Sequence, residues 1–266
     1  MRVIHSHRPN KEPDEPRPAS EERRRSGIYL LPNLFTTGAL FAGFYGIVAA
    51  INGHFEPAAI AVVIAMVLDG MDGRIARLTN TQSDFGAQYD SLADMASFGL
   101  APALIVYEWS LFELGKLGWL AAFLYASATA LRLARFNTQV GNADKRFFKG
   151  LPSPAAAALL ASIIWFGSSI HARESSAALA VTLLVTVGAA LLMVSNVRYY
   201  SFKDLDLRGR VPFVSVLAVV MVFVLISLDP ATVLLAMFAG YAISGPVLTW
   251  MQRRRTRAAR KEKKRT

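Results

Sequence analysis

The sequence predicts an all-α protein that crosses a membrane several times. Of its 266 residues, 53% are hydrophobic and only 18% are charged, whereas a soluble domain normally carries about 25% charged residues. The basic residues gather at the two ends of the chain, with seven Lys or Arg among the first 28 residues and nine among the last 14. Long apolar segments lie between these ends, and about 20 apolar residues suffice for a helix to span the hydrocarbon core.

Eight segments are predicted as membrane spans, and a tight Leu-Asp-Pro-Ala turn around Asp229 indicates that the last two form a helical hairpin. The spans are residues 29–50, 56–78, 87–108, 117–136, 152–170, 176–196, 211–228 and 231–251. We therefore expect three parts: a disordered cytosolic arm (residues 1–28), a transmembrane domain that carries any active site (residues 29–251) and a cytosolic polybasic tail (residues 252–266).

The connections between these spans differ strongly in charge. Alternate connections and the two ends hold 25 Lys or Arg on one side and 2 on the other. The positive-inside rule then places both termini in the cytosol, which fits a multi-pass protein of the inner (cell) membrane. The basic ends can bind anionic lipid, with a binding free energy of about 1 kcal/mol per basic residue near the surface, or they can bind nucleic acid. A tail that directly follows a spanning helix already lies at the bilayer, so we expect lipid and no nucleic acid.

Metal chemistry in this chain has to use oxygen ligands. The sequence has no cysteine and only four histidines, two in the N-terminal arm and two in short turns between spans. Thiolate and imidazole sites are therefore excluded as the centre of any activity.

Four aspartates stand where two predicted spans meet the cytosolic side. Asp69 and Asp72 are three residues apart and Asp90 and Asp94 are four apart, so each pair lies on one helical face. A short turn joins the two helices, which lets the two acidic stripes face one another. Each charge at a helix centre costs about 2.5–3.5 kcal/mol, and one or two divalent cations, Mg²⁺ or Mn²⁺, would balance them. Ion or proton transport is the alternative, but the other spans offer no partner acids.

Glycines flank these acids. Gly73 and Gly86 lie on the same faces, where the missing side chain leaves room for a ligand. Gly70 is instead expected to let two helices pack closely, as small residues do in membranes.

From Asp69 to Asp94 the chain matches D-x2-D-G-x2-A-R-x8-G-x3-D-x3-D without a mismatch, and so resembles the CDP-alcohol phosphatidyltransferase family. The resemblance implies transfer of a phosphatidyl group from a CDP-activated lipid to an alcohol with release of CMP, a core of six membrane helices, and a homodimer. It implies that three acids bind metal and that the fourth, Asp94, activates the incoming hydroxyl or also holds the second ion. The implied metal ligands are Asp69, Asp72, Asp90 and Asp94, and the implied CDP-binding residues are Asp69, Gly73, Ala76, Arg77 and Gly86.

Two further segments resemble the membrane-spanning phosphatidylserine synthases within this family. One is Pro32-Asn33-Leu34-Phe35-Thr36, and the other runs from Leu131 through Arg132 and Arg135 to Lys149 and Pro154. This subgroup implies CDP-diacylglycerol as donor and L-serine as acceptor.

The residues themselves leave several readings of these segments open. Arg132, Arg135 and Lys149 suit a phosphate or a substrate carboxylate, or they serve only topology and headgroup contact. Asn33 and Thr36 belong to the site or cap a helix entry. Glycerol 3-phosphate, inositol and choline are the alternative acceptors, and a divalent-cation transporter is the alternative from another class.

Overall fold

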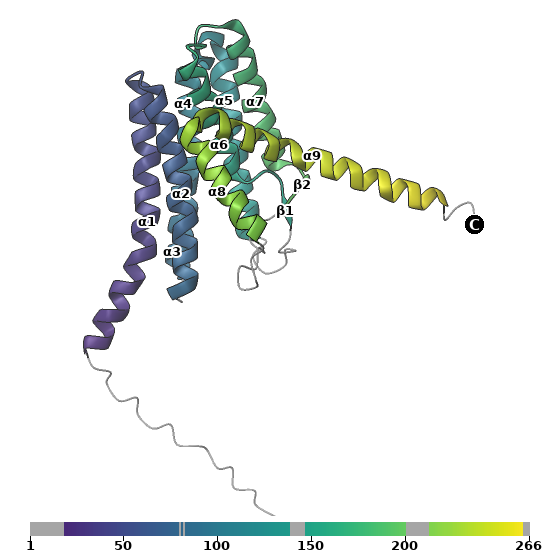
Figure 1. Cartoon of the computed structure of the whole chain (residues 1–266). Helices are drawn as coiled ribbons and strands as arrows, with labels where there is room; N and C mark the ends of the chain where they lie inside the picture. The colour runs from purple at the N-terminus through teal and green to yellow at the C-terminus, as the bar shows by residue number, and fades with distance from the viewer. Residues whose placement is uncertain (1–18, 80, 82, 139–146, 201–212, 263–266) are drawn as a thin grey trace, which may run out of the picture.

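A computed structural model of the chain describes residues 19–79, 81, 83–138, 147–200 and 213–262, almost all of them helical (Figure 1). The described helices are α1 (Ala19–Ile51), α2 (Phe55–Thr79), α3 (Asp84–Asp94), the π-helical η1 (Met95–Leu100), α4 (Ala101–Trp109), the 3-10 turn η2 (Leu111–Leu114), α5 (Lys116–Thr138), α6 (Ser153–Ser169), α7 (Ser176–Val194), α8 (Phe213–Leu228) and α9 (Pro230–Glu262). Two short strands, β1 (Phe147–Lys149) and β2 (Arg198–Tyr200), pair antiparallel.

The all-α, membrane-embedded class is confirmed. Four described helices are long and apolar enough to cross a membrane: Pro32–Ile51 of α1, α5, α7 and Pro230–Met251 of α9. The other expected spans are also helical, but each is too short or too polar to meet this criterion of length and apolar character. The α2 helix carries the aspartates, α6 and α8 are shorter, and the span expected at 87–108 is divided among α3, η1 and α4. The hairpin at Asp229 is confirmed, since α8 ends at Leu228 and α9 begins at Pro230.

Two helices are longer than the spans expected from the sequence. The α1 helix begins at Ala19, upstream of the expected start at residue 29, and α9 continues to Glu262 through the basic segment. Alanine, glutamate, arginine and lysine are strong helix formers, so a helix continues readily beyond the apolar stretch. The remainder of the expected arm (residues 1–18) and of the expected tail (residues 263–266) lies outside the described residues.

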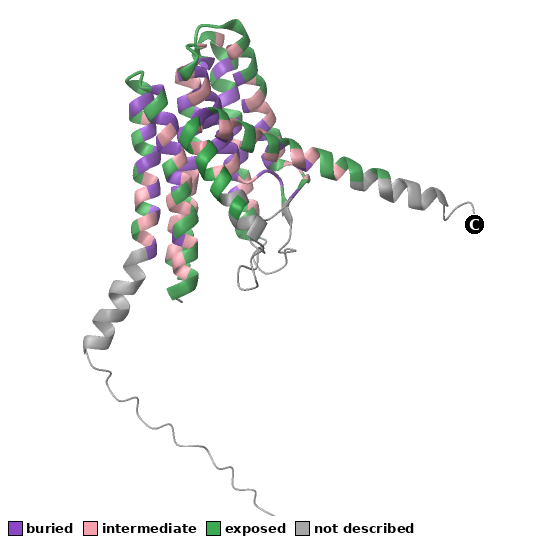
Figure 2. Ribbon diagram, in the orientation of Figure 1, coloured by how far each residue is buried: buried purple, intermediate pink, exposed green. Residues whose placement is uncertain are grey.

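The centre of the bundle is built on α6. This helix packs against α2, α4, α7 and α9, and most of its residues are buried, among them the run Ala156–Leu160. Small side chains allow neighbouring backbones to approach closely in membrane helices. Figure 2 shows the buried residues along the faces that the helices turn toward one another. The α1 helix packs along α2 and also contacts α3, which places three helices around the acidic segment.

A short two-stranded antiparallel sheet, absent from the all-helical expectation, joins the segment before α6 to the segment after α7. Gly150 has φ +83°, and a Cβ there would lie 2.2 Å from the Met193 carbonyl oxygen, so only glycine fits. Its backbone N–H donates to the Val197 carbonyl at 2.8 Å, and the N–H of Leu151 donates to the Leu192 carbonyl at 3.0 Å. Strands of three residues carry no usable alternation of apolar and polar positions, so sequence periodicity does not predict them.

Candidate active site

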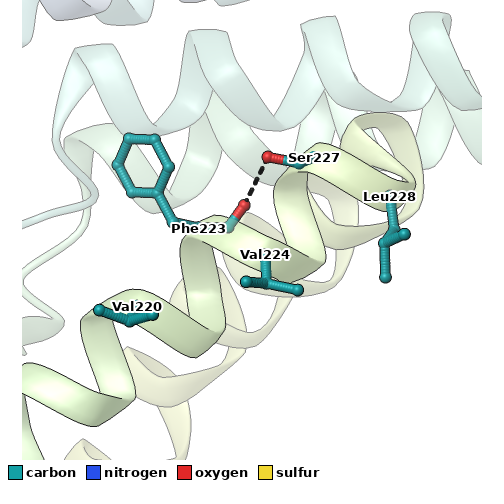
Figure 3. Close-up of a pocket in the computed structure, with 5 residues that line it drawn as sticks. All are labelled: Val220, Phe223, Val224, Ser227 and Leu228. Carbon is teal, nitrogen blue, oxygen red and sulfur yellow. Dashed lines mark hydrogen bonds between the residues drawn. The ribbon is translucent and has the colours of Figure 1, made fainter.

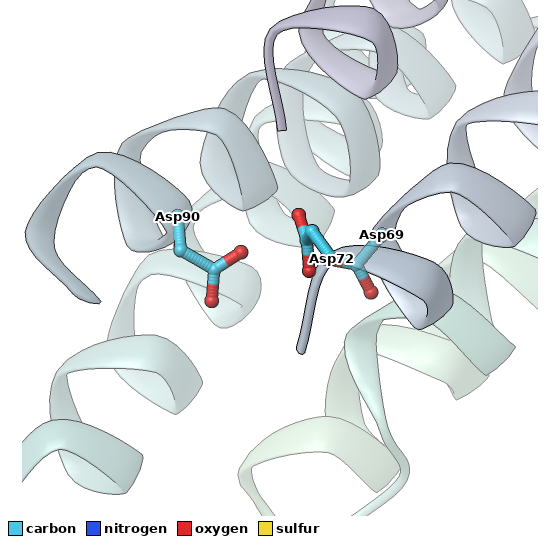
Figure 4. Close-up of side chains that lie close together, drawn as sticks. All are labelled: Asp69, Asp72 and Asp90. Carbon is cyan, nitrogen blue, oxygen red and sulfur yellow. The ribbon is translucent and has the colours of Figure 1, made fainter. Parts of the chain in front are cut away.

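Three aspartates from two helices bring their carboxylates together at the end of the bundle where α2 terminates. Asp69 and Asp72 come from α2 and Asp90 from α3, and one oxygen of each lies within 4.8 Å of the others. Figure 4 shows Asp90 facing the other two across the space between the helices. Asp72 is only 6% exposed. The expectation that the two acidic stripes face one another is therefore confirmed.

The chemistry of this donor set fits a divalent cation. Two unit charges about 4 Å apart repel by about 4 kcal/mol at an effective dielectric constant near 20, and three such carboxylates crowd the site. Carboxylate oxygens without nitrogen or sulfur ligands favour Mg²⁺ or Mn²⁺. The three acids can therefore hold a divalent ion.

Asp94 belongs to the site and contacts Asp69 of this triad through a side-chain hydrogen bond. It lies one turn after Asp90, is partly buried, and its carboxylate interacts electrostatically with Asp69, Asp90 and Asp72. Its oxygens do not join the set that converges within 4.8 Å. The structure thus groups three acids closely and places the fourth beside them.

The α1 helix braces Asp72 through Thr36. The Thr36 hydroxyl is buried and donates to Oδ2 of Asp72 at 2.8 Å, with the Pro32 carbonyl at a longer 3.2 Å. Since α1 begins at Ala19, the alternative of helix-entry caps for Asn33 and Thr36 is wrong. Asn33 lies near the site as well, because a Cβ on Gly86 would be 3.6 Å from its Oδ1.

The glycines near the acids differ in their surroundings. A Cβ on Gly73 would meet only the Arg77 guanidinium at 3.5 Å, so this face is open. Gly86 is more enclosed, since a Cβ there would lie 3.1 Å from the Oγ of Ser83, the N-cap residue of α3. The packing expected at Gly70 is wrong: a Cβ at that position would find no described atom within 4 Å. This residue faces outward on α2.

The residues expected to bind CDP lie at the end of α2 and the start of α3. Arg77 is exposed in the last turn of α2 and interacts electrostatically with Asp72. Ala76 is partly buried, and its carbonyl accepts a hydrogen bond from the Thr81 N–H at 3.1 Å. Together with Gly73 and Gly86 they border the acids on the side where α2 ends.

The three expected basic residues make different contacts, although Arg132 and Arg135 are close enough to interact electrostatically. Arg132 interacts electrostatically with Asp94 and donates from Nε to the Leu151 carbonyl at 2.5 Å. Arg135 instead donates from Nη2 to Oδ1 of Asn196 at 2.7 Å. Lys149 is exposed on β1. Of the three, Arg132 is therefore the one that the structure brings to the acids.

Several features that orient α3 were not predicted. Tyr89 and Thr37 join α3 to α1 through their hydroxyls at 2.9 Å. The Nδ2 of Asn137 on α5 donates to Oγ of Ser91 on α3 at 3.0 Å. Tyr89 and Ser91 flank Asp90 on α3, so these two bonds help to fix the rotation of α3 about its axis at Asp90.

The π-helical segment η1 directly follows Asp94. Its Phe98 carbonyl accepts a hydrogen bond from the buried Tyr125 hydroxyl at 3.1 Å, and Ser97 donates to the Ala39 carbonyl at 3.0 Å. A π segment shifts the helical register, and such segments occur frequently at functional sites. The sequence contains no residue pattern that predicts this π segment.

A hollow in the described surface lies far along the chain from the acids, on α8. It is lined by Val220, Phe223, Val224, Ser227 and Leu228 (Figure 3). The hydroxyl of Ser227 is already bonded to the Phe223 carbonyl at 2.9 Å. An apolar helix face of this kind suits lipid or another membrane helix, and it offers no group for chemistry.

The sequence model of the CDP-alcohol phosphatidyltransferase family matches residues 29–194, which is more than half of the chain. The chain belongs to this family. The matched region contains all four aspartates of the site, whereas β2, α8 and α9 follow it.

Curated relatives of this family member come from bacteria and archaea. The CDP-diacylglycerol–serine O-phosphatidyltransferase of Helicobacter pylori (strain ATCC 700392 / 26695) is 38% identical over 217 residues, 81% of this chain and 90% of that protein. The protein of the same name from Bacillus subtilis (strain 168) is 30% identical, covering 65% of this chain and 91% of its own. That from Methanocaldococcus jannaschii is 36% identical, covering 54% and 63%.

Proposed function

We propose that this protein transfers the phosphatidyl group of CDP-diacylglycerol to L-serine and releases CMP. The observation that carries the proposal is the convergence of three carboxylates from α2 and α3 inside a chain of this enzyme family. The names of the relatives support serine as the acceptor. A divalent-cation transporter that uses the same acids has no support from these relatives.

Asp69, Asp72 and Asp90 are the residues that would hold divalent metal, either Mg²⁺ or Mn²⁺. If Asp94 also contributes a ligand, the site would hold two ions. Bound metal would screen the diphosphate and stabilise the leaving nucleotide. Thr36 keeps the Asp72 carboxylate in place through its 2.8 Å hydrogen bond. Partners of this kind orient ligands and tune the metal.

Asp94 accepts the proton of the attacking hydroxyl in this proposal. The serine oxygen forms a bond to the phosphorus that carries diacylglycerol. The bond from this phosphorus to the bridging oxygen of the diphosphate breaks, and CMP leaves with that oxygen. The hydroxyl proton passes to the carboxylate of Asp94, which lies beside the triad. Proton transfer to a positioned carboxylate typically contributes about 10²–10⁴-fold to the rate.

The remaining predicted residues bind the two substrates. Gly73, Ala76, Arg77 and Gly86 border the acids where α2 ends and would receive CDP. Arg132 would hold the serine carboxylate, because its guanidinium lies near Asp94 and suits bidentate contact. Arg135 and Lys149, which lie by the two-stranded sheet, would attract anionic substrate rather than contact the reacting atoms. Asn33 would border the nucleotide.

The charge asymmetry of the sequence, 25 basic residues against 2, supports an inner-membrane protein with both termini and the active site in the cytosol. The basic ends would contact anionic lipid. Family resemblance supports a homodimer. Chemical cross-linking in native membranes tests this assembly, and a chain that stays monomeric would contradict it.

An acceptor assay tests the proposed function. Purified protein is supplied with CDP-diacylglycerol and metal, and L-serine, glycerol 3-phosphate, inositol and choline are added one at a time. We expect CMP and phosphatidylserine with L-serine and only background CMP with the others. CMP with another alcohol but not with serine would assign a different acceptor. No CMP with any alcohol, together with metal uptake into vesicles, would favour the transporter.

A further inference from the structure

The α9 helix, which lies outside the family-matched region, comes close to Arg132. A tyrosine on α9, Tyr241, is partly buried, and its phenol interacts electrostatically with Arg132. Arg132 in turn interacts with Asp94. Arg132 thus links Asp94, the carboxylate proposed to take the proton, to Tyr241 on a helix outside the matched region.

Tyr241 is held in place by a second tyrosine. The ring of Tyr199 on β2 lies 5.4 Å from that of Tyr241, centroid to centroid, with a 48° angle between the planes. Tyr199 is fully buried and donates from its hydroxyl to the Ala242 carbonyl at 2.9 Å. Tilted aromatic pairs at this distance are favourable beyond the area that they bury. The direction of the Tyr241 ring is therefore set by its packing.

Two further contacts join strand β2 to the same face of α9. A Cβ on Gly245 would lie 2.4 Å from the Tyr199 ring, so the ring fits only against glycine. The backbone N–H of Arg198 donates to Oγ1 of Thr249 at 3.2 Å. Positions 241, 245 and 249 are four residues apart and share one helical face. Three consecutive turns of α9 are thus attached to β2, which gives Tyr241 a rigid support.

The guanidinium of Arg132 is also held in a fixed orientation. Its Nε donates to the Leu151 carbonyl at 2.5 Å, which fixes the plane of the guanidinium. Leu151 is itself held by the Leu192 carbonyl at 3.0 Å. A guanidinium with a fixed plane presents its terminal nitrogens in one direction, as carboxylate recognition requires.

We infer that Tyr241 is a specificity-determining residue for the acceptor: its hydroxyl donates a hydrogen bond to the carboxylate of the amino-acid alcohol that Arg132 binds. This inference rests on the proposed function. The acceptor's hydroxyl has to reach Asp94, and Arg132, which interacts with both Asp94 and Tyr241, is placed to receive the acceptor's carboxylate. A site built to hydrogen-bond a substrate group discriminates against analogues that lack it, because its own polar groups are then left without a partner.

The test compares the Tyr241→Phe and Tyr45→Phe variants of the full-length protein. Tyr241→Phe keeps the ring on Tyr199 and removes only the hydroxyl. Tyr45 lies exposed on α1 and serves as the matched control. We expect the KM for L-serine to rise about 10-fold in Tyr241→Phe, since a hydrogen bond to a charged group contributes about that factor. The KM for CDP-diacylglycerol should stay within about twofold, and Tyr45→Phe should match the wild type.

Ethanolamine, which is serine without its carboxylate, completes the test. The preference of the wild type for serine over ethanolamine should fall about 10-fold in Tyr241→Phe. An unchanged KM for serine and an unchanged preference, in a variant with the wild-type thermal midpoint, would overturn the inference while leaving the proposed function intact. If the wild type instead makes CMP with another alcohol and not with serine, the proposed function fails first, and the two failures are distinguishable.

Discussion

The hydroxyl of Thr36 on α1 donates a 2.8 Å hydrogen bond to Oδ2 of Asp72 on α2, and both residues are buried. This bond connects α1, which contributes no carboxylate to the converging triad, to the acidic site. It also explains why α1, which packs along α2 and contacts α3, belongs to the functional part of the molecule.

The Thr36 bond predicts a loss of activity in Thr36→Val, which keeps the shape and removes the donor. We expect turnover and the apparent affinity for metal to fall at least about tenfold, since substitution of groups that orient metal ligands typically costs 10–100-fold. Thr36→Ser is the matched control and should retain most activity. CMP release measured over a series of Mg²⁺ or Mn²⁺ concentrations gives both values, and an unchanged metal response in Thr36→Val would contradict the role.

Metal removal should abolish the reaction. Exhaustive chelation is expected to stop CMP release, and added Mg²⁺ or Mn²⁺ should restore it. Asp90→Asn removes one of the three converging carboxylates and should lower turnover at least about 100-fold, because metal supplies several kcal/mol of transition-state stabilisation.

The control for that experiment is Glu113→Gln, at an exposed acid of η2 outside the triad, which should behave as the wild type. Full activity of the wild-type protein after chelation would contradict a metal-dependent site.

Asp94→Asn should separate proton transfer from metal binding. The variant keeps an oxygen and the size of the side chain but loses the basic carboxylate, so turnover should drop about 10²–10⁴-fold. Because Asp94 lies outside the three-acid set, the metal concentration for half-maximal activity should change less than in Asp90→Asn. Near-normal turnover in the purified variant would exclude Asp94 as the base.

Much of this architecture follows from local sequence properties. Apolar length predicted most helix boundaries within a few residues. The three-residue spacing of Asp69 and Asp72, together with the short turn before α3, predicted that these two acids face Asp90. These inferences succeed because helical geometry decides which residues share a face, and because a short turn places the two helices side by side.

Contacts between distant helices could not be predicted in the same way. The hydrogen bond from Thr36 to Asp72 and the packing of Tyr199 on Tyr241 depend on how each helix is rotated about its axis, which tertiary packing decides. The packing expected for Gly70 failed for that reason, since this residue faces outward. The π segment after Asp94 depends on contacts such as the one from Tyr125 to Phe98, which are also remote in sequence.

The contact of Tyr199 with α9 predicts a steric defect in Gly245→Ala. A methyl group there would lie 2.4 Å from a ring that is fully buried, and overpacking of this kind costs about 1–3 kcal/mol. Gly240→Ala is the control on the same helix, because a Cβ at position 240 meets no described atom within 4 Å. Alanine favours a helix over glycine by about 1 kcal/mol, so the control should equal or exceed the wild type in thermal midpoint. Equal midpoints for the two variants would contradict the close contact.

A substitution at the end of the bundle opposite the acids should lower stability without changing catalysis. Arg173 lies there and contacts the C-terminal end of α4. Its Nε donates to the Trp109 carbonyl at 3.0 Å, and its guanidinium lies 4.4 Å above the centre of the Phe55 ring. A cation at a helix C-terminus and above an aromatic ring contributes about 1 kcal/mol when exposed. Arg173→Ala should therefore lower the thermal midpoint in detergent, and Arg173→Lys should recover it only in part, because lysine lacks the planar fork.

Turnover per folded molecule should stay at the wild-type level in Arg173→Ala, as should the KM values for L-serine and for CDP-diacylglycerol, since the acids lie at the other end of α2. A change in the KM for serine in Arg173→Ala would instead show that the two ends are coupled.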